Sequence, residues 1–408
     1  MTSPTGSTAA HAAAPTSSLS CSADAIRSAA ERLLPDLQQG RRIDAARLRA
    51  AMETGFGGSD AQGFWDWKTA YEACEAASVL FLRQFGPAMR RRASSPAAFL
   101  AMLEKIAARF PTHTRRSDES DALQQFSTPI GLGFAAATAA AITPDDVVLE
   151  PSAGTGLLAI YAELAGAEML LNEFAQTRAD LLAGLFPQAP PTRFDAAHID
   201  DFLEAETRPS VVLMNPPFTA GAHVAGRVAD AALRHLRSAL ARLADGGRLV
   251  AITGASLSPD NPAWRDGFVQ LQELARMVFT APIEGAVYAR HGTTMPTRLT
   301  VFDKAPAGDP QCFPTAPGVA SDAATLLQWQ QGTLPPRRPV TPSRVAGAVR
   351  RLTPSRAVGV SVRPKIARAA GPDPHTEEIV YETVDWCPPE SGHLTDALYE
   401  PYALQAIR

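Results

Sequence analysis

The segment Asn215-Pro216-Pro217-Phe218 has the strongest chemical signal in the chain. It directly follows Val211–Met214, a short aliphatic run that predicts a buried strand. The two prolines stop the backbone from entering a helix, which holds the Asn215 side chain and the Pro216 carbonyl in one plane. These two acceptors can bind a planar exocyclic amine and direct its nitrogen lone pair at a methyl donor. Phe218 offers a ring on which a planar base or amide can stack.

A second segment is rich in glycine and lies between another predicted strand and a helical pattern. It reads Glu150-Pro151-Ser152-Ala153-Gly154-Thr155-Gly156. Glycines permit a tight turn and a close approach of the backbone to a ligand. One interpretation is a dinucleotide pyrophosphate at the helix N-terminus. The carboxylate of Glu150 argues against a pyrophosphate and favours a cationic ligand, such as the sulfonium and amino groups of S-adenosylmethionine (SAM).

Two further acids follow predicted strands. Glu173 lies 17 residues after Gly156, where a carboxylate can accept both hydroxyls of a nucleoside ribose. The alternative is an exposed loop acid. Asp195 lies where a third strand is expected to end, and it can accept the exocyclic amine of an adenine ring. A helix N-cap before Ala196 is the alternative for this residue.

The elements that must position these residues alternate between strands and helices over residues 121–304. Five runs predict strands: Val147–Leu149, Glu168–Leu171, Val211–Met214, Leu249–Ile252 and Leu299–Phe302. Three patterns predict helices: Gly156–Ala165, Arg178–Phe186 and Gly226–Leu243. This alternation predicts an α/β fold, a Rossmann-like doubly wound parallel sheet with helices on both faces. In such sheets, ligands bind beyond the carboxyl ends of the strands.

The N-terminal part of the chain reads differently. Residues 1–21 are of low complexity and predict disorder. Residues 22–120 predict a helical region, in which Gly55–Gly58 and Pro87 are expected to break helices. An aromatic-rich stretch comprises Trp65, Trp67, Tyr71, Phe81 and Phe85. These side chains are expected to anchor a helical core, the alternative being platforms on which bases stack.

In their order, these segments resemble the SAM-dependent methyltransferases that modify amino groups, most closely those that act on adenine N6. The Phe-x-Thr-Pro element at residues 126–129 precedes the glycine segment as in those enzymes, and the resemblance covers about residues 125–304. It implies that Thr128 and Pro129 flank the methionine moiety of SAM. The implied roles of the other residues are a SAM pocket lined by Glu150, Pro151, Ser152, Gly154, Thr155 and Gly156, a ribose contact at Glu173, an adenine contact at Asp195, and a target-amine site at Asn215, Pro216, Pro217 and Phe218. The implied reaction is direct methyl transfer to a flipped base, in DNA rather than RNA.

A narrower resemblance involves two other stretches. The aromatic segment Gly63–Trp67 and the segment Tyr288–Lys304 are similar to the N-terminal region of bacterial strawberry-notch-type proteins. In those proteins a methylase-like module precedes a helicase-like ATPase. This chain has no G-x-x-x-x-G-K-[ST] loop, so the resemblance implies a truncated or stand-alone methylase half, with a helicase-like module as a candidate partner.

Contacts with a nucleic-acid backbone are expected in two places. Near the last predicted strand, Tyr288 could stack a base while Arg290, His291 and Arg298 hold phosphates, the alternative being a plain surface hairpin. Residues 305–370 predict a Pro/Arg-rich linker, and residues 337–368 contain nine basic residues and no acidic one. This stretch is either a solvated linker or a phosphate contact. Residues 371–408 form an acidic segment with eight acids and one base.

The composition limits the classes of protein to which this chain can belong. With 46% hydrophobic and 20% charged residues, the 408-residue chain is of ordinary globular type. A net charge of −4 leaves only a local basic surface for a nucleic acid. Four dispersed cysteines predict neither a disulfide framework nor a metal site. Without a signal-like start or an apolar run of about 20 residues, we expect a cytoplasmic protein with no membrane partner. The alternative functions are methylation of RNA or protein glutamine, a nicotinamide-dependent oxidoreductase, and a non-catalytic binding module.

Overall fold

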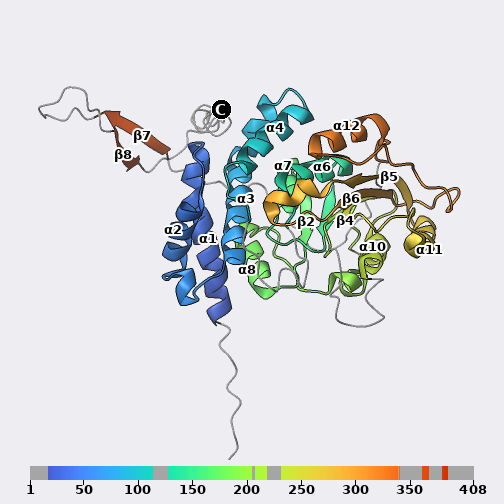
Figure 1. Cartoon of the computed structure of the whole chain (residues 1–408), viewed down its shortest axis with the longest axis horizontal. Helices are drawn as coiled ribbons and strands as arrows, with labels where there is room; N and C mark the ends of the chain where they lie inside the picture. The colour runs from blue at the N-terminus through green and yellow to red at the C-terminus, as the bar shows by residue number, and fades with distance from the viewer. Residues whose placement is uncertain are drawn as a thin grey trace, which may run out of the picture. The chain divides into compact units, whose positions relative to one another are not determined.

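The computed structural model describes residues 17–113, 127–204, 207–217, 231–338, 340, 361–366 and 379–384. The chain divides into two compact units, Met1–Arg344 with Glu400–Arg408, and Val345–Tyr399. The first unit contains the six-stranded sheet and all the described helices (Figure 1).

The larger unit is built around a six-stranded sheet of order β2-β1-β3-β4-β6-β5. Its strands are β1 (Val147–Glu150), β2 (Glu168–Leu171), β3 (Val211–Met214), β4 (Arg248–Gly254), β5 (Arg276–Ile283) and β6 (Thr297–Asp303). Strands β2, β1, β3 and β4 are parallel, whereas β6 runs antiparallel to both β4 and β5. The predicted doubly wound α/β fold and its five strand positions are confirmed, but the sheet is mixed instead of wholly parallel.

The predicted and the observed strands differ in two places. The sequence pattern does not predict β5, because this edge strand contains Pro282, which is tolerated only where no neighbouring strand needs its N–H. Conversely, the strand expected to end at Asp195 is reduced to a single bridge between Asn172 and Thr192.

Alternate side chains of the central strands enter two cores, one on each face of the sheet, as the two-residue period of a strand requires. On one face, Val148, Val211 and Val250 share a core with the helical region. The helices α6 (Ile130–Ala140), α7 (Ala159–Ala165), α8 (Gln176–Leu185) and α12 (Ala323–Thr333) contribute to it. On the other face, Leu149 and Val212 pack with α9 (Ile199–Phe202), α10 (Ala231–Arg242) and α11 (Pro262–Gln272). The sheet is therefore covered on both faces.

The N-terminal helices are α1 (Ser17–Gln38), α2 (Ala45–Phe56), α3 (Trp67–Arg92) and α4 (Pro96–Ala107), with a 3-10 turn, η1, at Asp60–Gln62. Helix α1 begins at Ser17, inside the segment expected to be disordered. Helix α3 continues through Pro87, because burial on both sides of the proline outweighs the loss of one N–H donor. The aromatic side chains lie in or against the core, which confirms them as its anchors. Since this core is continuous with that of the sheet, the helical region is part of the same unit.

The segment after β6 is also part of the folded unit, which corrects the linker predicted from residue 305. Its helix α12 packs on α6 and α4. The buried guanidinium of Arg248 pairs with Asp303 at 2.7 Å and donates to the Pro335 carbonyl at 2.9 Å. Arg337, the first residue of the basic stretch, pairs with Asp146 at 2.6 Å. The chain is thereby fastened to the sheet at least as far as residue 337.

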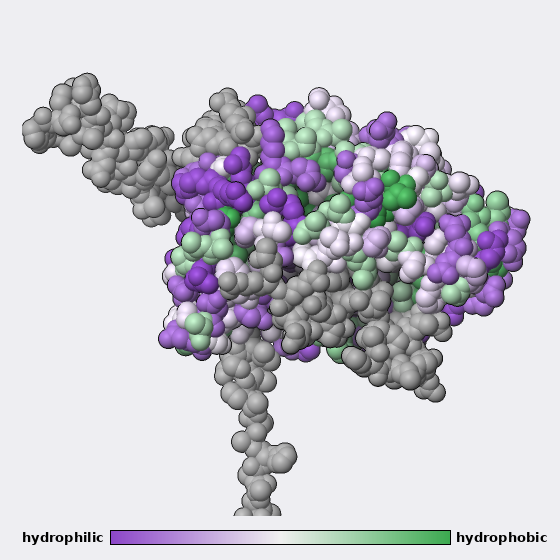
Figure 2. Space-filling view, viewed as in Figure 1, coloured by the Kyte–Doolittle hydropathy of each residue, from purple (hydrophilic) through white to green (hydrophobic). Residues whose placement is uncertain are grey.

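The second unit, described by itself, contains two antiparallel strands, β7 (Ser361–Ile366) and β8 (Ile379–Val384). Of the basic and acidic segments, the structure describes residues 337, 338, 340, 361–366 and 379–384, and the others lie outside the described part of the chain, as do residues 1–16. On the face seen in Figure 2, polar and apolar residues are interspersed. No described helix is both long and apolar enough to cross a bilayer.

Candidate functional site

A cavity of about 1020 Å³, its open mouth included, lies at the carboxyl ends of β1, β2 and β3. Among the residues that line it are those expected at Thr128, Glu150, Pro151, Ser152, Gly154, Thr155, Glu173, Asp195, Asn215, Pro216 and Pro217. The structure thus brings together residues that are up to 89 positions apart in the sequence. Pro129 is instead the N-cap of α6, Gly156 packs against Phe186, and Phe218 lies outside the described residues.

The glycine loop connects β1 to α7 and is joined to the next strand by hydrogen bonds. Gly154 and Gly156 have φ values of +56° and +88°, in the region that favours glycine. The Ala153 amide donates to the Asn172 carbonyl at 2.9 Å, and the Gly154 amide donates to the Glu173 carboxylate at 2.9 Å. The loop is therefore held at the sheet edge, and a Cβ added at Gly154 would meet no atom within 4 Å.

Glu150 is a buried carboxylate that lines the cavity. Its side chain is hydrogen-bonded to the Ala159 amide, while Oε2 has no hydrogen-bond partner among the described residues. Burial raises the pKa of Glu150 well above its usual value, and the nearby Glu173 carboxylate raises it further. A cation at Oε2 would favour the charged form of this group. The orphaned oxygen therefore fits a positively charged ligand.

Glu173 and Asp195 both take part in local backbone contacts. The two oxygens of Glu173 accept from the amides of Gly154 and Ala175, each at 2.9 Å. Each carboxylate oxygen can accept a second hydrogen bond, so Glu173 can still bind hydroxyl groups. Asp195 accepts from the Ala197 amide at 2.9 Å, which confirms the N-cap interpretation of a 3-10 turn, η2 (Ala196–His198). It lies on the cavity wall at the same time.

Asn172 organises this edge, although the sequence pattern does not single it out. Its buried side-chain amide donates to the carbonyls of Pro151 and Phe194 at 2.9 and 3.0 Å. Its Oδ1 accepts from the Thr192 hydroxyl and the Phe194 amide, both at 2.8 Å. One side chain thus ties the glycine loop to the segment that carries Asp195.

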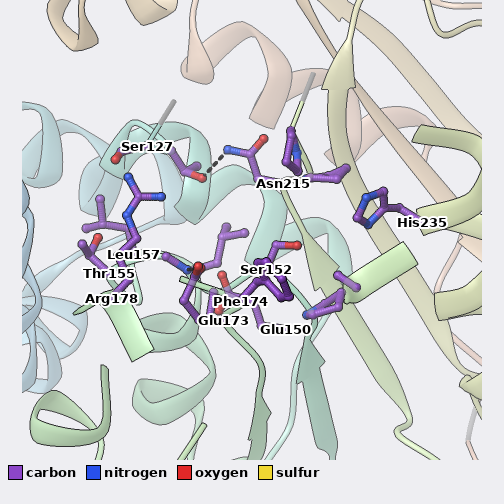
Figure 3. Close-up of a pocket in the computed structure, with 18 of the residues that line it drawn as sticks. Ser127, Glu150, Ser152, Thr155, Leu157, Glu173, Phe174, Arg178, Asn215 and His235 are labelled. Carbon is purple, nitrogen blue, oxygen red and sulfur yellow. Dashed lines mark hydrogen bonds between the residues drawn. The ribbon is translucent and has the colours of Figure 1, made fainter. Parts of the chain in front are cut away.

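Asn215 lies directly after β3 and is oriented by the segment before α6. Its Nδ2 donates to the Thr128 hydroxyl at 2.8 Å, the dashed line in Figure 3. The buried Tyr288 side chain interacts with the same amide. Because Nδ2 is used as a donor to Thr128, the rotamer of the amide is defined and Oδ1 is the acceptor end.

The helical region supports one wall of the cavity from behind through contacts with lining residues, which the sequence patterns do not predict. The Thr155 hydroxyl donates to Glu75 of α3 at 2.7 Å. Arg178 lines the cavity and pairs with Glu72 of α3 at 2.7 Å. Figure 3 shows Arg178, Thr155 and Ser127 on the side of the cavity opposite His235. The lining residues that sequence reasoning missed are Ser127, Ala153, Leu157, Leu158, Phe174, Arg178, Ala196 and His235.

The expected nucleic-acid contacts near the last strand need correction. Tyr288 and Arg290 belong to a 3-10 helix, η3 (Gly285–His291), and Tyr288 is fully buried. Arg298 is 6% exposed and donates to the Thr280 hydroxyl at 2.8 Å, so its guanidinium is not available to a phosphate. Arg290 donates to the Phe110 carbonyl at 2.8 Å, and His291 packs edge-on against His113. Tyr288 and Arg298 are therefore not available to a nucleic acid, Arg290 and His291 contact the segment after α4, and the four residues do not form a surface hairpin.

Comparisons with known proteins add a distant likeness of fold. No protein-family model and no curated protein matches the chain. Among solved structures, it is similar to a modification subunit of a putative type I restriction enzyme from Vibrio vulnificus YJ016, with 15% identity and a TM-score of 0.41. The similarity covers 59% of this chain and 58% of that one.

Two further solved structures are similar to a comparable degree. The M protein of the type I restriction enzyme EcoKI has 15% identity and a TM-score of 0.38, over 72% of this chain and 62% of that one. A putative class I SAM-dependent methyltransferase from Listeria monocytogenes has 13% identity and a TM-score of 0.41, over 76% and 94%. This chain therefore spans about 60% of the length of each restriction-enzyme subunit.

Proposed function

We propose that this chain transfers a methyl group from SAM to the exocyclic N6 amine of adenine in DNA. One observation carries the proposal: Asn215, Pro216 and Pro217 follow β3 and line the same cavity as the glycine loop and Glu150. A site for a planar amine and a site for a cationic nucleoside are thus adjacent. This is the arrangement that a direct transfer between two ligands requires.

The cavity residues fit SAM. The unpartnered Oε2 of Glu150 suits its positive charge, and Glu173 retains acceptor capacity for ribose hydroxyls. The Asp195 carboxylate on the wall can accept an adenine amine. Gly154 leaves open space where a side chain would meet the ligand. In this proposal, bound SAM supplies the reactive methyl group at its sulfonium centre.

The chain's own residues hold and orient the target amine. Oδ1 of Asn215 and the Pro216 carbonyl accept its two hydrogens, which increases lone-pair density on the nitrogen. Thr128 keeps the Asn215 amide in the required rotamer through the 2.8 Å hydrogen bond. The prolines keep the backbone acceptor at the cavity edge. No strong general base is required, because the methylated nitrogen becomes acidic and releases its proton to water after the transfer.

The proposal also specifies the nucleic acid that is the substrate and a partner protein. The resemblance of the Asn-Pro-Pro-Phe and Phe-x-Thr-Pro segments to adenine-N6 enzymes supports adenine N6 as the target. DNA is the proposed nucleic acid and RNA the alternative, because Asn-Pro-Pro-aromatic segments serve the same chemistry on both. The basic residues of 337–368 other than Arg337, which pairs with Asp146, are candidates for a contact with the phosphate backbone. The resemblance to strawberry-notch-type proteins supports a helicase-like partner.

The test is to incubate the purified chain with methyl-labelled SAM and unmethylated bacterial DNA, and to analyse the digested nucleosides by mass. We expect labelled N6-methyldeoxyadenosine. Asn215→Ala should lower turnover by at least about 100-fold, as loss of a group that stabilises the transition state does, and leave SAM affinity within a few-fold. Asn261→Ala, which removes the same side chain from the N-cap of α11, is the matched control and should retain turnover.

The outcomes separate the alternatives. Full turnover in Asn215→Ala, or loss of SAM binding in that variant, would contradict the role of Asn215. Label that appears only in RNA or in a glutamine-containing protein would replace the substrate and keep the reaction class. SAM binding without transfer to any of these substrates would identify a non-catalytic module.

A further inference from the structure

A second cluster of polar side chains lies beside the cavity, in a small pocket between α3 and η3. It contains Glu75, His113 and His291, one ligand atom of each lying within 4.8 Å of the others. These residues come from α3, from the segment after α4 and from η3. The sequence shows no metal-ligand spacing because these three segments are far apart along the chain.

The two histidine rings are held in place by packing. The ring of His113 stacks on Tyr71 at 3.9 Å between centroids, with an interplanar angle of 11°. Its amide donates to the Arg290 carbonyl at 2.8 Å, and the Arg290 side chain returns to the Phe110 carbonyl. His291 meets His113 edge-on at 5.1 Å. The segment after α4 and η3 therefore hold both rings in a defined geometry before any ligand binds.

The protonation states suit a metal ion. Burial lowers the pKa of His113 to about 3 and that of His291 to about 4, so both rings are neutral at pH 7 and offer a lone pair. Nδ1 of His291 is buried and has no hydrogen-bond partner among the described residues. Burial also raises the pKa of Glu75 to about 7, although Ser127 and Thr155 are hydrogen-bonded to its carboxylate. A divalent ion would favour the charged form of this acid.

Other charged groups face the cluster. Glu72 and Arg178 form their own ion pair next to Glu75. Arg290 is exposed, and its charge opposes that of a bound cation. The opposition is reduced by solvent, because charges at the surface are screened more than buried ones. The balance of nearby groups therefore permits a cation between the carboxylate and the two neutral imidazoles.

We propose that Glu75, His113 and His291 bind one divalent first-row transition-metal ion. Two imidazole nitrogens and one carboxylate oxygen are ligands that suit zinc and its neighbours, whereas magnesium and calcium prefer oxygen alone. In a tetrahedral site with bonds of about 2.0 Å, ligand atoms are about 3.3 Å apart. The three ligand atoms lie within 4.8 Å of one another, so the separations must shorten by up to about 1.5 Å on binding, and three protein ligands leave one position for water.

The ion would connect the helical region to the cofactor cavity. Glu75 is hydrogen-bonded to Thr155 of the glycine loop and to Ser127, which Figure 3 shows on the same side of the cavity. His291 and Tyr288 belong to η3, and Tyr288 contacts Asn215. The site therefore lies at a junction of three segments, and none of its three residues lines the cavity.

The test uses the full chain without a histidine tag, stripped of metal with a chelator. Added Co²⁺ is followed by its visible absorption, Zn²⁺ by competition, and the stoichiometry by elemental analysis. We expect one ion per chain and an increase in unfolding temperature on metal addition. His113→Ala and His291→Ala should each weaken binding by more than about 100-fold, beyond the effect of losing an outer-shell partner.

The control is His198→Ala, since His198 is an exposed histidine outside the cluster. It should bind the ion like the unchanged protein. Circular dichroism identifies any variant that fails to fold, and Glu75→Gln then serves as an additional ligand variant. Failure of the unchanged chain to bind Co²⁺ or Zn²⁺ would overturn the proposal. Binding that persists in a folded double variant, His113→Ala with His291→Ala, would overturn it equally.

Discussion

Replacing Gly154 or Gly156 with alanine separates ligand contact from packing within one loop. At Gly154 the added methyl group enters open space in the cavity, because no atom lies within 4 Å of the new Cβ. At Gly156 the new Cβ would lie 2.3 Å from Cε2 of Phe186 and 3.1 Å from Cδ1 of Leu182. Phe186 cannot easily yield, since it is 2% exposed and lies under the Arg83 guanidinium at 4.8 Å.

The magnitudes follow from these contacts. An alanine in the left-handed region costs roughly 1–2 kcal/mol, and this is the whole cost expected at Gly154, where φ is +56°. At Gly156, φ is +88° and the methyl group also overpacks the core, which adds about 1–3 kcal/mol. The free energy of unfolding should therefore fall by about 1–2 kcal/mol in Gly154→Ala and by about 2–5 kcal/mol in Gly156→Ala.

Ligand affinity should show the opposite order. We expect Gly154→Ala to weaken SAM binding by at least about tenfold, which corresponds to 1.4 kcal/mol, because its methyl group occupies the ligand's space. Folded Gly156→Ala should bind within a few-fold of the unchanged chain. Urea unfolding measures the first quantity and isothermal titration calorimetry the second. Unchanged SAM affinity in Gly154→Ala would refute the assignment of this loop to the cofactor, and equal stability of the two variants would refute the packing argument.

Two further variants test the neighbouring groups. Thr128→Val removes the acceptor that orients the Asn215 amide, so turnover should fall about tenfold, the cost of one hydrogen bond of about 1.4 kcal/mol. Thr128→Ser keeps the hydroxyl and should restore turnover. Equal turnover in Thr128→Val and the unchanged chain would count against the orienting role. SAM should favour the ionised form of Glu150, whose pKa is raised in the free protein, so binding should release a proton and tighten as pH rises towards that raised pKa. Calorimetry in two buffers of different ionisation enthalpy measures the number of protons released on binding. Glu150→Gln should abolish this release. Identical heats for the unchanged chain in both buffers would contradict the prediction.

Local sequence predicted the central elements well because their signals are local. The limits of β2 and β3 agree with the predicted runs at both ends. For β3 the signal is clear because its aliphatic run is buried along its whole length. Strand direction is different, because the antiparallel course of β6 depends on its partners β4 and β5. Likewise, local rules predict that Pro87 breaks a helix, but the packing of α3 in the core keeps the helix continuous through this residue.

The candidate site was predictable to the extent that its residues follow strands. Glu150, Glu173 and Asn215 each lie at or just after a strand end, and the carboxyl ends of parallel strands converge on one edge. Asn172 and Arg178 were missed because nothing in the neighbouring sequence marks their contacts. The pairs Glu72–Arg178 and Glu75–Thr155 span 106 and 80 residues.

The sequence by itself therefore determined which groups are present at the carboxyl edge of the sheet: a glycine loop, two strand-end acids and an asparagine before two prolines. Only the tertiary structure decided their state. Burial raises the pKa of Glu150, a distant threonine orients Asn215, and burial removes Arg298 from any surface role. The tertiary structure also brought Glu75, His113 and His291 together. Desolvation and the choice of hydrogen-bond partners depend on atoms that are near in space and remote in the chain, and local sequence patterns do not contain that information.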